Sequence, residues 1–334
     1  MQPIEIVKKI LDEQYGALPQ NKEGEAFAPS NIALCKYWGK RDVNLHLPVT
    51  SSLSVSLRDK GVQTRVTLSE ENRDIIKLNR KVLEKNSVFA KRIVDFLNLF
   101  RDNLHCNLHF TVETFNNIPV GAGLASSAAG FAALVCALDK LFGWCLDKKQ
   151  LSILARLGSG SACRSLWQGF VQWHAGSAED GMDSFAECLP YNWPDLTLGL
   201  LTLSTEMKSV SSREAMQRTV NTSRYYKLWP DQVHDDLQSL ITAIKQQDFN
   251  LLGKTAEANA MVMHGLMLTS RPAILYSTSE TIAAIKQIWK LRSSGVNVYF
   301  TQDAGPNLIL LFLKQDIAKI KQEFSQVEIV LPFK

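Results

Sequence analysis

Several features that would point to other classes of protein are missing from this sequence. Its six cysteines form no CxxC pair, and no histidine stands at zinc-ligand spacing, so neither a zinc knuckle nor a thioredoxin-type site can be read. No apolar run approaches the length of a bilayer span, and residues 308–313 are far too short. Residues 1–11 lack the apolar core of a signal peptide. We therefore expect a cytoplasmic protein with reduced cysteines and no membrane partner.

The charge lacks the asymmetry of a nucleic-acid-binding protein. The chain has 37 Lys and Arg residues and 33 Asp and Glu residues, a net charge of +4. It has no block of basic residues of the kind that binds a nucleic-acid backbone. A polyanionic small molecule is the better-fitting partner. The 46% hydrophobic and 21% charged content is ordinary for globular proteins and argues against disorder.

The chain is long enough for two domains of mixed composition. Its 334 residues exceed one usual domain, and breakers cluster at Pro190, Asn192 and Pro194, which predicts domains at 1–192 and 193–334. Both the alternating apolar pattern of strands and the three-to-four-residue apolar spacing of helices occur along the chain, which predicts an α+β fold. The expected strands are 53–57, 62–68, 108–112 and 196–203, the expected helices are 125–142, 150–157, 212–226, 231–246 and 277–291, and a hairpin is expected at 296–313.

A glycine-rich loop precedes the alanine-rich helix. Small residues let a ligand approach the backbone, and a helix start offers free N–H donors, so the loop suits a phosphate. It matches neither a Walker loop nor a dinucleotide fingerprint. Tight packing of a helix start explains the pattern equally well. The residues concerned are Gly121, Ala122, Gly123, Leu124, Ala125, Ser126, Ser127 and Ala128.

Three further clusters have both a functional and a plain interpretation. Residues 36–41, KYWGKR, bring cations and a phenol beside a glycine. This group could bind a diphosphate, or it could be an exposed basic turn. Residues 158–164, GSGSACR, could bind a phosphate, with Arg164 free to pair with a carboxylate. The same residues could also form a flexible connector. Residues 303–307, DAGPN, read alone as a turn.

In this order, the segments resemble those of mevalonate diphosphate decarboxylases, of the superfamily of galactokinase, homoserine kinase and mevalonate kinase. The resemblance rests on NIALCKYWGKRD, LPVTSSLSVSL, PVGAGLASSAAGFAAL, GSGSACRSLWQGFVQW, VSSREAMQRTV and DAGPN. It implies an N-terminal domain like ribosomal protein S5 domain 2, a ferredoxin-like C-terminal domain and an active site between them. It also implies ATP-dependent decarboxylation of mevalonate 5-diphosphate to isopentenyl diphosphate, with ATP and Mg²⁺ required, and a homodimer.

The resemblance assigns roles to individual residues. Asp303 would receive or orient the proton of the substrate's 3-hydroxyl, Lys40 would lie near it and stabilise the transferring phosphoryl group, and Arg164 would hold the substrate carboxylate. The loop 121–128 would hold the ATP phosphates, with Ser127 a magnesium ligand. The other substrate-binding residues would be Tyr37, Trp38, Gly39, Ser159, Gly160, Ser161, Ala162, Cys163, Ser212 and Arg213.

Two departures from the family pattern bear on the substrate. Thr50 stands where family members usually have Asn, and Gly265 and Leu266 follow His264 where many have Ala-Thr. A relative acting on mevalonate 5-phosphate or mevalonate, a plain small-molecule kinase, and an inactive binding protein therefore remain as alternatives. The number of anion donors favours the diphosphate. The retention of Asp303, Lys40 and Arg164 argues against an inactive protein.

Overall fold

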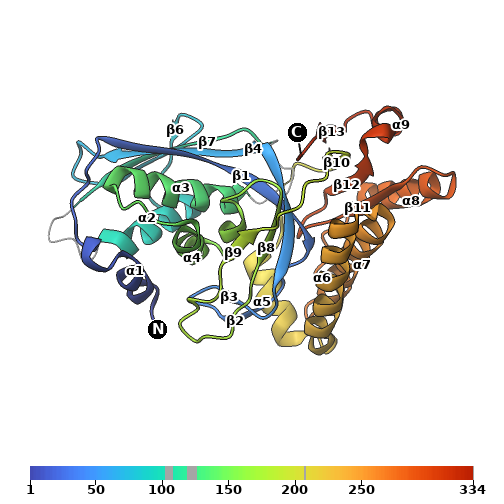
Figure 1. Ribbon diagram of the computed structural model, residues 1–334, viewed down its shortest axis with the longest axis horizontal. Coiled ribbons are helices and arrows are strands. Elements are labelled where there is room, and N and C mark those ends of the chain that lie inside the picture. The colour runs from blue at the N-terminus through green and yellow to red at the C-terminus, as the bar shows by residue number, and fades with distance from the viewer. Residues whose placement is uncertain (102–107, 119–125, 207, 334) are drawn as a thin grey trace.

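The computed structural model describes residues 1–101, 108–118, 126–206 and 208–333 (Figure 1). The fold is mixed α+β and consists of two units, each built on its own sheet. None of the helices within the described ranges is both long and apolar enough to cross a bilayer.

A seven-stranded sheet forms the first unit, in the order β6-β5-β7-β4-β8-β9, with β1 also paired to β4. Only the β5–β7 pair is parallel among these strands. Its strands are β1 (Glu23–Cys35), β4 (Ser52–Leu68), β5 (Ile75–Leu78), β6 (Lys81–Val82), β7 (Phe110–Asn116), β8 (Phe170–Trp173) and β9 (Ala186–Cys188). A small hairpin of β2 (Lys40–Asp42) and β3 (Leu47–Pro48) stands apart from it.

Four helices cover one face of this sheet, as Figure 1 shows. They are α1 (Pro3–Leu11), α2 (Val88–Arg101), α3 (Ser126–Phe142) and α4 (Lys148–Gly158). Their apolar stripes meet in one core, where Ile6, Phe96, Leu138 and Leu154 join Val112 of β7. Two 3₁₀ turns, η1 (Asp12–Gln14) and η2 (Gly160–Arg164), follow α1 and α4.

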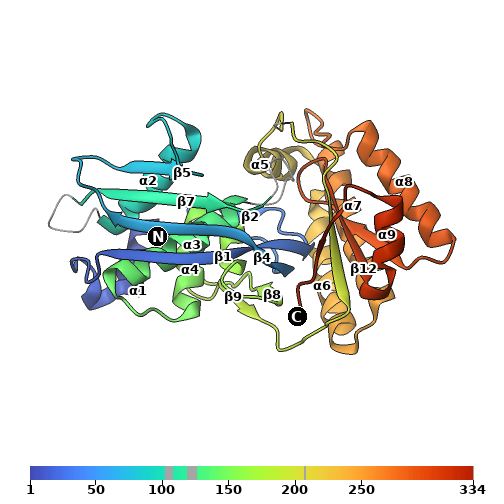
Figure 2. The ribbon, with the colours of Figure 1, turned by 90° about the horizontal axis from the view of Figure 1, so that it is seen from above.

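The longest strand corrects one of the predictions. The alternation predicted two strands at 53–57 and 62–68, but β4 is a single strand of 17 residues. Arg58, with φ of 52°, lies where the two predicted strands meet. The first part of β4 pairs with β8 and packs in the core shared with the second unit, and the second part pairs with β7 and packs in the helix-covered core. Figure 2 shows the ends of β1 and β4 reaching α6 and α7.

The second unit has an antiparallel sheet in the order β11-β12-β10-β13. With one helical crossover after β10 and another after β12, this is the ferredoxin-like βαββαβ order, in which the first crossover is expanded to several helices. Its strands are β10 (Leu196–Leu201), β11 (Val298–Thr301), β12 (Leu308–Leu313) and β13 (Glu328–Val330). Its helical segments are α5 (Ser212–Thr222), η3 (Tyr226–Leu228), α6 (Trp229–Gln246), α7 (Phe249–Leu268), α8 (Ser279–Ser293), η4 (Lys314–Asp316) and α9 (Ile317–Glu323).

Most of the predicted elements in this half are confirmed, but α7 was missed. The predicted strand, hairpin and helices match β10, β11–β12, α5, α6 and α8 within a few residues. Helix α7 has 20 residues, and its buried face carries the polar residues Thr255, Glu257 and Asn259 as well as apolar ones. Its exposed face in turn carries Met261 and Leu268, so the helix lacks the one-sided apolar stripe by which a sequence reveals a helix.

The two sheets are separate, but the core between them is continuous. One apolar cluster includes Ile32 of β1 and Val55 of β4 together with Leu198 of β10 and Leu310 of β12. We keep the division at residues 192 and 193 as a proposal, because that point lies between the last strand of the first sheet and the first of the second.

Candidate active site

A cavity of about 580 Å³ is lined by residues of both units. This volume is typical of a small-molecule site. Eleven of the sequence-predicted site residues line it: Tyr37, Trp38, Lys40, Ser127, Ser159, Gly160, Ser161, Arg164, Ser212, Arg213 and Asp303. The predicted residues Gly39, Ala128, Ala162 and Cys163 do not line the cavity and are buried behind it.

Asp303 lies on the turn between β11 and β12, and this turn is braced from inside the second unit. The side chain of Gln302 donates to the carbonyl of Gly305 at 2.8 Å, and the Asp303 carbonyl accepts from Nε2 of His264 at 3.1 Å. Burial lowers the pKa of His264 to about 4, so its ring is neutral. DAGPN is thus a turn, as its composition indicates, and the turn also brings a carboxylate into the cavity.

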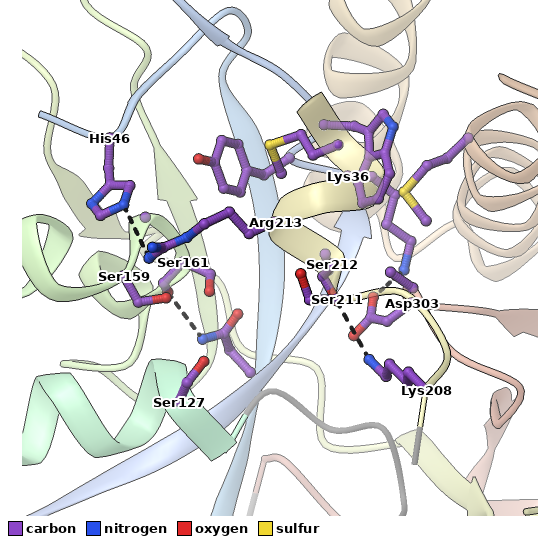
Figure 3. A pocket seen from close by; sticks show the side chains of 18 of the residues that line it. Lys36, His46, Ser127, Ser159, Ser161, Lys208, Ser211, Ser212, Arg213 and Asp303 are labelled. Carbon is purple, nitrogen blue, oxygen red and sulfur yellow. Dashed lines mark hydrogen bonds and ion pairs between the residues drawn. The ribbon is translucent and has the colours of Figure 1, made fainter. Parts of the chain in front are cut away.

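The lysine that contacts Asp303 is Lys36, where the family resemblance had placed Lys40. Its Nζ lies 2.6 Å from Oδ1 of Asp303 (Figure 3). Lys36 is 2% exposed and the carboxylate 24%. Burial lowers the pKa of Lys36, and the nearby Asp303 opposes that shift. β1 carries Lys36 into the junction, whereas Lys40 lies in β2, where the charges that act on it are those of Arg213 and Arg92.

Two helices of the second unit hold Lys36 in place. Oδ1 of Asn259 accepts from the backbone N–H of Lys36 at 2.8 Å, and Nδ2 of Asn259 donates to Asp236 at 2.7 Å. The other carboxylate oxygen of Asp303, Oδ2, makes no hydrogen bond to any described residue. One oxygen is therefore committed to the lysine, and the other can accept a proton or a hydrogen bond.

Arg164 presents a buried guanidinium that lacks a counterion. It donates to Asn31 at 3.2 Å and to Ser52 at 2.5 Å, and it lies 5.8 Å from the ring centre of Trp173. It is 3% exposed, and no ion pair in the described part of the chain includes it. Burial lowers its pKa. A buried arginine held only by neutral groups suits a ligand carboxylate.

Three more cations gather on the Arg213 side of the cavity, namely Lys40, Arg92 and Arg213. Burial, together with the charges of Arg213 and Arg92, lowers the pKa of Lys40 to about 8. Arg92 donates weakly to the carbonyl of Gly158 at 3.5 Å. Within residues 1–101, 108–118, 126–206 and 208–333, no carboxylate lies within ion-pair distance of these three groups. The cluster therefore suits a polyanionic ligand.

The GSGSACR segment is ordered, so its interpretation as a flexible connector is wrong. Ser159 ends α4 in an extended conformation, and residues 160–164 form the 3₁₀ turn η2, of which Gly160, Ala162, Cys163 and Arg164 are buried. A Cβ on Gly160 would lie 2.8 Å from the hydroxyl of Tyr37. That hydroxyl is buried and makes no hydrogen bond in the described structure, which leaves it free for a ligand oxygen.

KYWGK is not an exposed basic turn either. Lys36 and Trp38 are 2% and 3% exposed. Gly39 has φ of +123°, and a Cβ there would lie 1.7 Å from the hydroxyl of Tyr226, which donates to the carbonyl of Trp38 at 3.0 Å. The second unit thus closes over this turn, and only glycine fits at its centre.

The start of α5 presents Ser212 and Arg213 to the cavity. Ser211 is the N-cap, and its hydroxyl accepts from the backbone N–H of Glu214 at 3.2 Å. Ser211 and Glu214 have the spacing of a capping box, but only half of it forms, because the Glu214 side chain instead binds Arg218 at 2.6 Å.

The phosphate loop is described only in part. Gly121, Ala122, Gly123, Leu124 and Ala125 lie outside the described residues. Helix α3 begins at Ser126, and Ser127 lines the cavity. No group of three or more His, Cys, Asp or Glu residues that could hold a metal occurs in the described ranges.

Sequence reasoning missed twelve of the residues that line the cavity, among them the polar or charged Asn31, Lys36, His46, Arg92, Glu206 and Lys208. Lys36 and Asn31 belong to the segment NIALCKYWGKRD, so that motif held their signal. Arg92 and His46 stand in no recognisable motif. The residues that depart from the family pattern, Thr50, Gly265 and Leu266, are not part of the described lining.

Comparison with known proteins shows which families and relatives the chain resembles over most of its length. Residues 28–186 match the family model "Diphosphomevalonate decarboxylase-like N-terminal domain", and residues 200–330 match "Mevalonate 5-diphosphate decarboxylase C-terminal domain". Diphosphomevalonate decarboxylase mvd1 of Aspergillus fumigatus is 38% identical over 310 residues, 86% of this chain and 76% of its own. Diphosphomevalonate decarboxylase of Saccharomyces cerevisiae is 37% identical over 312 residues, 88% of this chain and 78% of its own.

Solved structures agree. The structure described as "MDDEF in complex with MVAPP, AMPPCP and Magnesium" has a TM-score of 0.86 and 39% identity, covering 92% of this chain and 96% of its own. Mevalonate diphosphate decarboxylase from Staphylococcus aureus has a TM-score of 0.87 and 34% identity, covering 92% and 95%.

Proposed function

The chain belongs to the diphosphomevalonate decarboxylase family, and from this we propose that its cavity binds mevalonate 5-diphosphate beside ATP and converts it to isopentenyl diphosphate, ADP, phosphate and CO₂. The enzyme is a carboxy-lyase of isoprenoid biosynthesis. One observation carries the assignment: two kinds of unsatisfied cation, a buried arginine and a three-cation cluster, face the same cavity as an ion-paired aspartate. The substrate has a carboxylate, a diphosphate and a tertiary hydroxyl to match them.

Asp303 is the proposed acceptor for the proton of the 3-hydroxyl. Its Oδ1 is held by Lys36, and its Oδ2 is free to receive a hydrogen bond. ATP supplies the phosphoryl group that makes this hydroxyl oxygen a leaving group. When phosphate departs, the electron pair of the carbon–carboxylate bond forms the new double bond, and CO₂ is released.

Arg164 is the proposed partner of the substrate carboxylate. Its geometry is fixed by Asn31, Ser52 and the Trp173 ring, so pairing with a ligand requires little loss of side-chain freedom. The departing CO₂ is neutral and keeps no salt bridge to the guanidinium. The arginine thus holds the reacting group in line and then releases it.

The diphosphate is proposed to bind on the opposite side of the cavity. Tyr37, Ser159, Ser161 and Ser212 supply hydroxyl donors, and Lys40 and Arg213 supply charge. Lys40 thus stays in the proposed site with the diphosphate, rather than Asp303, as its anion. Gly39, Gly160, Ala162 and Cys163 shape the backbone behind these groups, and Trp38 covers them.

The nucleotide would lie beside the start of α3. The described residues fit a phosphate there, because Ser127 lines the cavity in the first turn of the helix, where backbone N–H groups are free. Magnesium usually keeps several waters and binds through phosphates and one or two protein oxygens, so it needs no protein cage. Ser127 is the proposed protein ligand.

A relative acting on mevalonate 5-phosphate is the second candidate function. Three cations without counterions exceed what one phosphate neutralises, and this favours the diphosphate. The test is to incubate the protein with ATP, Mg²⁺ and each of the three mevalonate forms and to measure ADP and CO₂ separately. Equal amounts of the two products, greatest with the diphosphate, are expected. ADP without CO₂ would make the protein a 3-kinase.

The proposal also covers the cellular location and the oligomeric state of the protein. We place the enzyme in the cytoplasm, where ATP is abundant, and expect a homodimer from the family resemblance. Cell fractionation and light scattering of the purified protein test these two points.

A further inference from the structure

His46 is a buried histidine that the reaction outlined above does not use. It ends the turn that joins β2 to β3, is 8% exposed, and lies between Leu45 and Leu47, both fully buried. It lines the same cavity as Arg213. Figure 3 shows its ring facing the guanidinium of Arg213, which comes from the other unit of the fold.

The hydrogen bonds of His46 define its tautomer. Nδ1 lies 3.1 Å from the backbone carbonyl oxygen of Arg156, which can only accept, so Nδ1 carries the proton. Nε2 then has a free lone pair, and it lies 3.5 Å from Nη2 of Arg213, which can only donate. A single neutral imidazole thus connects a carbonyl in the last turn of α4 to an arginine at the start of α5.

The turn that carries His46 is itself held by α4. The guanidinium of the buried Arg156 donates to the carbonyl of Leu45 and, at 3.0 Å, to that of Gly181. The imidazole in turn satisfies a carbonyl that the end of a helix leaves without an intrahelical partner. These reciprocal bonds fix the ring rigidly against α4, directly before the Ser159–Gly160 segment.

All of the charged groups that face His46 are cations: Lys40 of β2, Arg213 of α5 and Arg156 of α4. Burial, together with the charges of Lys40 and Arg213, lowers the pKa of His46 to about 3. The ring is therefore neutral throughout the physiological range, and its lone pair stays available to the arginine.

We propose that His46 is a positioning residue for Arg213. It holds the exposed side chain of Arg213 toward the part of the cavity where the diphosphate is proposed to bind, and thereby determines affinity for the substrate's diphosphate group. This rests on the proposed function of the same cavity. An arginine at an exposed helix start samples many rotamers, and fixing it on binding costs affinity. Holding it in advance removes part of that cost, roughly tenfold in affinity.

The test separates binding from turnover. The dissociation constants of mevalonate diphosphate and of inorganic pyrophosphate are measured by calorimetry without ATP, alongside kcat and KM. His46→Ala should weaken both ligands about tenfold and raise KM to match, with kcat within about twofold. His46→Gln, whose amide can donate and accept, should recover most of the affinity. His174→Ala, which removes a partly exposed imidazole outside the cavity, is the control and should change neither constant.

A double-mutant cycle tests whether His46 acts through Arg213. In the Arg213→Ala background, adding His46→Ala should change affinity by less than about twofold, because the group that it positions is gone. Independent, multiplying effects would overturn the proposal, as would unchanged affinity in His46→Ala or a His46→Gln variant no better than His46→Ala.

A measurement on the unaltered protein covers the case in which the alanine variant fails to fold. Nitrogen NMR of labelled histidine should show the Nδ1–H tautomer of His46, with Nε2 unprotonated, between pH 6 and 8. A protonated Nε2 would sink the proposal. Pyrophosphate binding requires no decarboxylation, so absence of CO₂ release would contradict the proposed function while leaving this test valid.

Discussion

On the Asp303 side of the cavity, the buried Lys36 has a carboxylate at 2.6 Å, whereas on the Arg213 side three cations share the space and no described carboxylate neutralises them. The first arrangement holds a charge inside the protein at a defined position. The second leaves charge unsatisfied until a ligand arrives. Groups of the first kind suit the reacting centre, and groups of the second kind suit recognition of the part that does not react.

The largest expected effect comes from removing the negative charge of Asp303, on the side of the cavity where the lysine and the carboxylate are paired. Asp303→Asn keeps a good turn former while deleting the proton acceptor, so kcat should fall at least about a hundredfold with KM nearly unchanged. Steady-state kinetics on purified variants measure both constants. Near-normal kcat would make Asp303 a turn residue only.

A double variant separates chemistry from folding at this site. Asp303→Asn leaves the buried ammonium of Lys36 without its carboxylate, which should lower the melting temperature. Adding Lys36→Met removes that unpaired charge, so the melting temperature should recover while kcat stays low. Recovery of activity along with stability would show that folding alone had been lost.

On the unneutralised side, losing one charge should affect binding rather than rate. Arg213→Ala removes a contact to a diphosphate that does not react, so KM should rise about 10- to 100-fold with kcat within a few-fold. Initial rates at saturating ATP measure this. A lowered kcat at constant KM would place Arg213 with the reacting groups.

The lowered pKa of Lys40 predicts a pH dependence. Lys40 is charged below its pKa of about 8 and neutral above it, so kcat/KM for the substrate should fall as pH rises through 8. The bound polyanion favours the charged form, so the same limb should appear at higher pH in kcat. Lys40→Met should bind more weakly at pH 7 and lose this limb. Lys81→Met, on an exposed strand, should keep it.

The smallest effect concerns how the two units meet at Gly39. Tyr226→Phe deletes the hydrogen bond to the Trp38 carbonyl and should lower the free energy of unfolding by about 1 kcal/mol without changing KM. Urea denaturation measures the loss. Tyr225→Phe, with its side chain 60% exposed, is the matched control and should be neutral. A large change in KM would mean that this bond also shapes the substrate site.

Local chemistry made much of this structure readable in advance. The strand β10, the β11–β12 hairpin and α3 follow from periodicity, and the glycines of KYWGK and GSGSACR follow from motifs. Helix α7 was not readable, because polar residues on its buried face and apolar residues on its exposed face leave no one-sided apolar stripe.

The partners within the site were harder to foresee. Asp303 lies 267 positions from Lys36, and Arg213 lies 167 positions from His46, so only the packing of the two units brings each pair together. A motif shows which residues matter, but it does not show which lysine of two reaches the aspartate. That choice depends on the direction in which β1 enters the junction.

The apolar cluster that joins β1 and β4 to β10 and β12 has a consequence for how the protein can be divided. Beside the polar cavity, both halves have an apolar surface at the junction: Ile32 and Val55 on one side, and Leu198 on the other, would face water if the halves were expressed apart. Separate halves should therefore aggregate or reassemble on mixing, and heat should melt the whole chain in one cooperative step. The active site thus persists for as long as the fold itself does.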